Sequence, residues 1–305
     1  MRMHGHDFKL GSDPEAFIWD TVGREFVGAH GLLEGTKSDP YHMGQGFYCQ
    51  VDGMAAEFNT PVYPYEDELK HGIRQGLHLV NRQLDKVEKG RFKAMFIDYA
   101  FFTQAEIDRQ PRSSFILGCD PDYNAITLGK NPTPELPDFF RTAGVHIHVS
   151  WTQGMDVNDP GHFLAGACLT RAYHLSMYGP PKLRQAFYGA PYSFRPKSYG
   201  VELRSTGSSY INGRQAHDLQ TLIGHAFYLK GSIVSRAPTP EFITNVNNGL
   251  EYCIYKQQMR LLKLHREELR GYYTRAVAAT NRMYDSSSDD KYITQATEED
   301  MGEAA

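Results

Sequence analysis

Four segments, far apart in the chain, alternate apolar and chemically functional side chains with a period of two residues. They are SDPEAF (residues 12–17), DGMAAEFN (52–59), GVHIHVS (144–150) and GVELRST (200–206). Side chains two residues apart share one face of a β-strand, so each segment predicts a strand with one apolar and one functional face. Such strands fit an antiparallel sheet that packs one face on the core.

The functional faces carry carboxylates, imidazoles and a guanidinium. They comprise Asp13, Glu15, Glu57, His146, His148, Glu202 and Arg204. Asp, Glu and His bind hard divalent cations such as Mg²⁺ or Mn²⁺, and Arg binds phosphates and carboxylates. Carboxylates gathered on one sheet repel one another by ~1–4 kcal/mol a pair at surface-like dielectric, and a divalent cation relieves that repulsion. The pattern therefore predicts a metal site with an anion-binding group beside it.

Each motif also has a plain structural interpretation. The D-P-E motif fits a turn, since Pro14 cannot donate a hydrogen bond to a sheet. The H-x-H motif fits an exposed histidine pair, the E-x-R motif fits a cross-strand salt bridge, and Glu57 fits a partner for a lysine. All four faces together fit the wet side of a half-exposed sheet. The site hypothesis depends on their co-occurrence.

The remaining pattern indicates an α+β fold. Apolar residues at helical spacing predict a helix over residues 65–89 that covers a sheet; they are Leu69, Ile73, Leu77, Val80, Leu84 and Val87. We predict further helices over 161–177, 215–235 and 248–280, and strands within 8–60, 92–102, 142–151 and 198–211, with a hairpin turn at 21–23. The sheet is expected to be curved and mainly antiparallel, with the helices packed on its apolar face.

The length and composition limit the function classes. With 305 residues, of which 41% are hydrophobic, we expect one domain over residues 1–284 and an acidic, disordered tail over 285–305. The net charge of −4 argues against a nucleic-acid partner. Four cysteines without a CxxC pair fit a reducing compartment, and no signal peptide or apolar run of ~20 residues occurs. We expect a cytoplasmic protein without a membrane partner.

Three further cations lie in segments rich in glycine or proline. Lys37, Arg195 and Lys197 are predicted to be in loops, where they either reach a phosphate or are surface charge. Asp120 and Asp122 are further carboxylates, although their D-P-D motif is typical of a turn. The chain has no GxxxxGK[ST], GxGxxG or GxSxG motif, which argues against a P-loop ATPase, a dinucleotide-binding domain and an α/β-hydrolase.

Six motifs follow one another along residues 8–235: GSDPEAF, EGTKSDP, VDGMAAEFN, LGCDPDYNA, GVHIHVS and FYGAPYSFRPKSYGVELRS. As an ordered set they resemble the amidoligase superfamily, the carboxylate–amine ligases related to glutamine synthetase and glutamate–cysteine ligase. The branch that they resemble most is the phage-type branch, the phiEco32-like COOH·NH₂ ligases of type 2. The resemblance implies a glutamine-synthetase-like catalytic domain of bacteriophage origin, acting in the host cytoplasm.

The resemblance also implies a reaction and a set of roles. The enzyme would use ATP and Mg²⁺ (or Mn²⁺) to convert a substrate carboxylate to an acyl phosphate, which an amine then attacks to give an amide. Metal ligands map to Asp13, Glu15, Glu57, His146, His148 and Glu202, catalytic residues to Glu57, Arg204 and Arg195, and cofactor-binding residues to Lys37, Arg195 and Lys197. The loop over 31–46 is the candidate lid that excludes water.

Two features of the resemblance leave questions open. Asp13 stands where the family more usually has glutamate, and fewer acidic residues flank the second strand than in glutamine synthetase, so the number of metals is open. The substrates carry a carboxylate and an amine, on a small molecule, a peptide or a protein, and an oligomer is compatible with the resemblance. The alternatives are a phosphotransferase of guanidino-kinase type on the same fold, a His/carboxylate metal hydrolase, and a non-catalytic protein that retains an old site.

Overall fold

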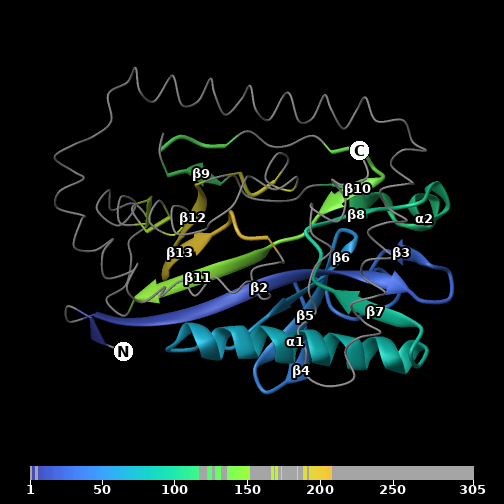
Figure 1. Cartoon of the computed structure of the whole chain (residues 1–305), viewed down its shortest axis with the longest axis horizontal. Coiled ribbons are helices and arrows are strands. Elements are labelled where there is room, and N and C mark those ends of the chain that lie inside the picture. The colour runs from blue at the N-terminus through green and yellow to red at the C-terminus, as the bar shows by residue number, and fades with distance from the viewer. Residues whose placement is uncertain are drawn as a thin grey trace, which may run out of the picture.

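A computed structural model describes residues 2–3, 6–116, 122–125, 128–131, 136–151, 166–167, 169–170, 173, 184, 188–190 and 192–207. These residues form a mixed α+β fold built on an open sheet of eleven strands (Figure 1). Its main path runs β4 (Tyr41–Gly44), β5 (Phe47–Asp52), β6 (Ala55–Asn59), β2 (His6–Asp20), β11 (Val145–Trp151), β13 (Gly200–Leu203), β12 (Ser193–Lys197) and β9 (Tyr123–Asn124). The paired strands are antiparallel, which confirms the predicted class.

The fifteen-residue strand β2 organises the sheet. It pairs with β6 and β11 on the main path, and also with β1 (Arg2–Met3), β3 (Glu25–Val27) and β7 (Phe92–Met95). The predicted hairpin turn is confirmed, because β2 and β3 pair on either side of residues 21–24.

The acidic D-P-E motif lies inside β2, so its interpretation as a turn is wrong. Glu15 donates its N–H to Gly144 on the β11 side, whereas Leu10 donates its N–H to Tyr63 on the β6 side. Alternation along the strand therefore directs the nitrogen of Pro14 toward β6. The β2–β6 ladder lacks one donor there, and the β2–β11 ladder stays complete. This arrangement admits a proline to an interior strand.

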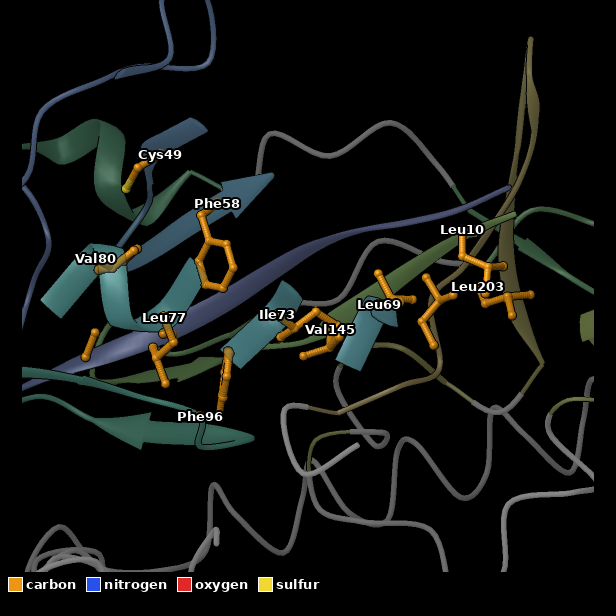
Figure 2. Packing of buried hydrophobic residues seen from close by; sticks show 14 of the residues in the cluster. Leu10, Cys49, Phe58, Leu69, Ile73, Leu77, Val80, Phe96, Val145 and Leu203 are labelled. Atoms are coloured by element: carbon orange, nitrogen blue, oxygen red, sulfur yellow. The ribbon is translucent and has the colours of Figure 1, made fainter. Parts of the chain in front are cut away.

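One face of the sheet packs on helix α1 (Glu66–Val87), as the apolar stripe predicts. Leu69, Ile73 and Leu77 of α1 meet Leu10, Val145 and Phe58 from three different strands (Figure 2). The final member of the stripe, Val87, was expected to be buried but is 50% exposed, because it closes the helix.

Two glycines let α1 approach the sheet closely. A Cβ on Gly72 would overlap the ring of Tyr63, and a Cβ on Gly76 would overlap the ring of Phe58. Glycine in a helix interior costs roughly 0.5–1 kcal/mol relative to alanine, so its presence here indicates that close packing outweighs helix propensity.

The second face of the sheet is only partly open, which corrects the expectation of a wholly polar face. Phe17 and Trp19 share the face of Asp13 and Glu15 but pack in a separate apolar cluster. The cluster includes residues of the small sheet formed by β8 (Tyr99–Phe101) and β10 (Phe140–Thr142). Helix α2 (Gln104–Arg109) and the 3₁₀ helix η1 (Arg112–Phe115) follow β8. β8, β10 and α2 lie on the side of β2 opposite α1 (Figure 1). The functional residues lie on the rest of this face.

Several strand and helix predictions need adjustment. The buried strand expected over 92–102 is two strands, β7 and β8, which belong to different sheets. Segment 193–197, expected to be a loop, is strand β12. The described residues within 161–177 are helical and buried, as predicted. Predictions for 215–235, 248–280 and 285–305 fall outside the described residues. Within those residues, no helix combines the length and the apolarity that a membrane span requires.

Replacing Gly76 with alanine tests the close packing of α1. We expect Gly76→Ala to lower the free energy of unfolding, because overpacking costs about 1–3 kcal/mol and the gain in helix propensity is only about 0.5–1 kcal/mol. The measurement is urea unfolding. His78→Ala, at an exposed position of the same helix, is the control and should leave stability nearly unchanged. A Gly76→Ala protein as stable as the wild type would show that Phe58 does not confine the helix.

Candidate functional site

Strand register brings the predicted residues side by side on the open part of the second face. Across β5, β6 and β2, Gln50 faces Glu57 and Glu57 faces Glu15. Asp13 of β2 faces His146 of β11 in the next row. In the row after that, His148 of β11 faces Glu202 of β13, which faces Arg195 of β12. Residues up to 190 positions apart in the sequence therefore meet because neighbouring strands share one register.

The two histidines converge on Asp13. His146 Nδ1 lies 3.3 Å and His148 Nε2 lies 3.0 Å from Asp13 Oδ1, so both histidines that the sequence offered face the same carboxylate. Neither approach has the angles of a hydrogen bond. Buried Asp13 Oδ1, His146 Nε2 and His148 Nε2 consequently have no hydrogen-bond partner within the described part of the chain. Buried polar atoms without such partners are costly, so this group is suited to receive a ligand.

The charges of this group stabilise each other. Burial raises the pKa of Asp13, but the attraction of His148 and His146 outweighs it and holds that pKa well below its usual value. Burial likewise lowers the pKa of His148, but the Asp13 carboxylate outweighs it, so the net shift is upward. The other ring nitrogen of His148, Nδ1, makes a short contact with the hydroxyl of Tyr199.

Glu202 is fully buried and surrounded by cations. Arg204 Nη1 contacts Glu202 Oε1, Lys197 Nζ lies 3.0 Å from Oε2 and Arg195 Nη1 lies 3.3 Å from Oε2. Burial raises the pKa of Glu202, but the attraction of Arg204, followed by that of His146 and His148, outweighs it and brings the pKa to about 2. Glu202 is thus ionised and gathers three positive side chains at one end of the face. We call Arg195, Lys197 and Arg204 the cation group.

Arg204 is the buried member of the cation group. Its Nη2 donates to the hydroxyl of Tyr188, its guanidinium carbon lies 5.3 Å from the Tyr188 ring centre, and its Nε lies 3.6 Å from Asp122. Only 2% of its side chain is exposed, against 15% for Arg195 and 29% for Lys197. Arg195 and Lys197 can therefore reach a bound anion, whereas Arg204 holds Glu202 in position.

A second group, Glu15, Glu57 and Asp52, lies at the other end of the face, where the pKa values of Glu15 and Glu57 are raised rather than lowered. We call it the acid group. Burial, together with the charges of Asp13, Asp52 and Glu15, raises the pKa of Glu57 well above its usual value, despite a 2.9 Å hydrogen bond from Gln50. Burial is also the main cause of the raised pKa of Glu15, which accepts a 2.7 Å hydrogen bond from the N–H of Gly144.

Glu15 and Asp52 of the acid group border a small, partly open pocket. Glu15 and Asp52 contribute its acidic wall, Phe17 and Met54 an apolar wall, and Tyr188 links it to the cation group. Lys37 marks the outer border, since its ammonium lies 2.9 Å from Asp52 and half of its side chain is exposed. Lys37 is therefore near the acid group rather than the cation group.

The donor atoms fit a hard divalent cation. Carboxylate oxygens of Asp13, Glu15 and Glu57 are the ligand type that Mg²⁺ and Mn²⁺ prefer, and a cation would relieve the repulsion that raises two of these pKa values. Asp13, His148 and Glu202 also place ligand atoms within 4.8 Å of one another. Among the described residues these three form the one group of such side chains whose ligand atoms come this close, and three side-chain cations already compensate the charge of Glu202.

The sequence alone did not identify five contributors: Gln50, Asp52, Arg184, Tyr188 and Tyr199. The alternation in FYCQVD could have revealed Gln50 and Asp52, because both share the face of Glu57. Arg184 is buried, and its charge attracts the carboxylate of Glu15. Arg184, Tyr188 and Tyr199 do not belong to any segment in which apolar and functional residues alternate, so the sequence pattern could not identify them. Asp122 was interpreted as part of a turn yet contacts Arg204, whereas Asp120 lies outside the described residues.

Comparison with models of known protein families found no match to this chain, and comparison with curated proteins found none either. The function must therefore be inferred from the chemistry of the two groups on the sheet face.

The raised pKa values predict a pH-dependent cation affinity. At low pH the carboxyls of Glu57 and Glu15 are protonated and must lose protons before they bind a cation, so we expect the Kd of Mn²⁺ to fall as pH rises from 5.5 to 7.5. Each displaced proton contributes at most about a tenfold change per pH unit. Glu57→Gln should weaken binding and flatten the slope in calorimetric titrations. Equal affinity at both pH values would contradict the acid-group assignment.

The lowered pKa of Glu202 predicts a second pH effect, on stability, over a lower pH range. Its pKa is about 2 when folded and near its usual value of 4.5 when unfolded, so it stabilises the fold above pH 4.5 and loses that contribution as pH falls toward 2. We expect Glu202→Gln to lower the free energy of unfolding at pH 7 by about 3 kcal/mol, and by less at pH 3. Urea unfolding at both values checks this, with exposed Glu68→Gln as the control. A loss that is equal at both pH values would point to packing instead of charge.

Proposed function

We propose that this protein is an ATP-dependent carboxylate–amine ligase that forms an amide through an acyl phosphate, on a glutamine-synthetase-like sheet of the amidoligase type. The observation that carries the proposal is that the acid group and the cation group lie on the same face of the sheet. A metal–triphosphate needs both: carboxylates for the metal and cations for the phosphoryl oxygens.

Glu15, Glu57 and Asp13 would hold Mg²⁺, which neutralises charge on the triphosphate when bound. Arg195 and Lys197 bind the γ-phosphoryl oxygens, because both are partly exposed and Glu202 holds both in place. Arg204 acts as a positioning residue through Glu202, since its guanidinium is buried among Glu202, Tyr188 and Asp122. Catalysis by positioning and charge stabilisation is the usual strategy for phosphoryl transfer.

The proposed amide formation proceeds in two steps. A substrate carboxylate oxygen attacks the γ-phosphorus, and the bond from that phosphorus to ADP breaks. The amine nitrogen then attacks the acyl carbon, the carbon–oxygen bond to phosphate breaks, and the amine loses a proton. Asp52, a carboxylate in the wall of the pocket that is not among the proposed metal ligands, is placed to accept that proton. The pocket beside Glu15 and Asp52 is the proposed approach of the substrates to the phosphoryl group.

A second candidate is a metal hydrolase centred on Asp13, His148 and Glu202, whose ligand atoms lie within 4.8 Å of one another. Three cations already compensate the charge of Glu202, and Tyr199 contacts His148, so this set is less suited to hold a metal. A phosphotransferase would use both groups without an amine substrate, so it predicts the same nucleotide binding.

Thermal unfolding with and without ATP and Mg²⁺ tests the proposal before any substrate is known. A ligand at 100 times its Kd adds about 2.7 kcal/mol to the free energy of unfolding, enough to raise the Tm by a few degrees. We expect this rise in the wild type and its loss in Glu57→Gln and Glu202→Gln. Glu68→Gln makes the same substitution at an exposed helix position and should keep the rise.

The remaining outcomes separate the alternatives. A rise with Mg²⁺ or Mn²⁺ alone, and none from ATP, would favour the hydrolase. No rise under any condition would exclude the ligase. If ATP binds, hydroxylamine should trap an acyl phosphate from candidate carboxylates in the wild type. ADP formation without a trapped acyl group, and with a phosphorylated guanidine, would favour the phosphotransferase.

A further inference from the structure

An aromatic pair extends the same sheet face beyond the acid group. His42 of β4 faces Tyr48 of β5, their ring centres are 4.9 Å apart and the rings are inclined by 43°. Tyr48 lies on the face of Gln50, two residues along β5, and therefore on the face of the acid group. Tyr48 is 42% exposed, so its ring presents an apolar surface to solvent.

His42 and Tyr48 lie in one row of the sheet with Asp13 and His146. Tyr48 faces Asn59 of β6. The register of β6 with β2, which the hydrogen bond from Thr60 N–H to Ser12 O continues, brings Asn59 beside Asp13. Asp13 in turn faces His146 of β11. One row across five strands therefore begins with two aromatic rings in tilted contact and ends at Asp13 and His146.

The length of the row fits a nucleotide. Neighbouring strands lie ≈ 4.7–4.9 Å apart, so Tyr48 on β5 and His146 on β11 are separated by three spacings, or about 14 Å. An extended nucleoside triphosphate covers a similar distance from its base to its terminal phosphate. Aromatic side chains bind bases by stacking, and a base on Tyr48 would direct the phosphates along the row toward Asp13.

We propose that Tyr48, supported by His42, is the platform on which the base of the bound nucleotide stacks. This inference rests on the proposed function and adds the orientation of the nucleotide: its base lies over β4 and β5, and its phosphates cross β6 and β2 toward the cation group on β12 and β13. The platform contributes to binding through the base alone. A ligand with the same phosphates and no base gains nothing from it.

Calorimetric titration of the full chain with Mg²⁺-ATP and with Mg²⁺-tripolyphosphate tests this orientation. Loss of a stacked base corresponds to about 5- to 150-fold weaker binding. We expect Tyr48→Ala to weaken ATP by a factor in this range, to leave the Kd of tripolyphosphate unchanged, and to be rescued by Tyr48→Phe. Tyr65→Ala is the matched control, because Tyr65 is similarly exposed but lies at the N-terminus of α1, outside the row.

The results distinguish failure of this inference from failure of the proposed function. If the wild type binds ATP and Tyr48→Ala binds it equally well, the platform is excluded and the ligase proposal stands. Equal weakening of ATP and tripolyphosphate in Tyr48→Ala would likewise exclude it, since the residue would then act on the phosphates or on the fold. If the wild type binds neither ligand, both proposals fail.

Discussion

The antiparallel pairing of β2 with β6 on one edge and β11 on the other is the constraint on which the rest of the structure depends. Because side chains alternate along β2, Leu10, Ala16 and Ile18 pack in the core beneath α1, while Asp13 and Glu15 face the other way. A slip of one residue in either register would bury the carboxylates in the core and expose the core residues to solvent. The energy that fixes the core therefore also fixes the site.

The acid group and the cation group lie at opposite ends of the site face, so charge on this face is distributed unevenly. Three cationic side chains contact the Glu202 carboxylate and compensate its charge, so this fully buried group holds the cation group together. Glu15 and Glu57 face each other across β2 and β6 with raised pKa values, even though His146 and Arg184 attract Glu15. A buried carboxylate that is costly to ionise becomes a strong site once a cation arrives, because binding removes the repulsion. The two groups together are suited to a ligand with both positive and negative charge, such as a metal–triphosphate.

Local periodicity predicted α1, the hairpin after β2 and the faces of β11 and β13, because each depends on residues close in sequence. Periodicity could not predict the order of the strands in the sheet. It therefore could not predict that Glu57 lies opposite Glu15 or that Arg195 lies opposite Glu202. Pro196 misled the prediction, because it occupies a strand position that a proline-based rule assigns to a loop, whereas Pro14 only left a turn open as the alternative to the predicted strand. The apolar half of the second face was readable in Phe17 and Trp19, which share the alternation of Asp13 and Glu15.

The separation in sequence between β2 and its partner β11 has a consequence for how the protein is made. The hydroxyl of Ser12 bonds to the backbone of His146, 134 residues later. At translation rates of ≈ 5–20 residues per second, one edge of β2 waits on the order of ten seconds for its partner to emerge. An unpaired strand edge is a template for wrong pairing with other chains. Assembly of this sheet should therefore be slow and sensitive to protein concentration and to chaperones that shield the nascent edge.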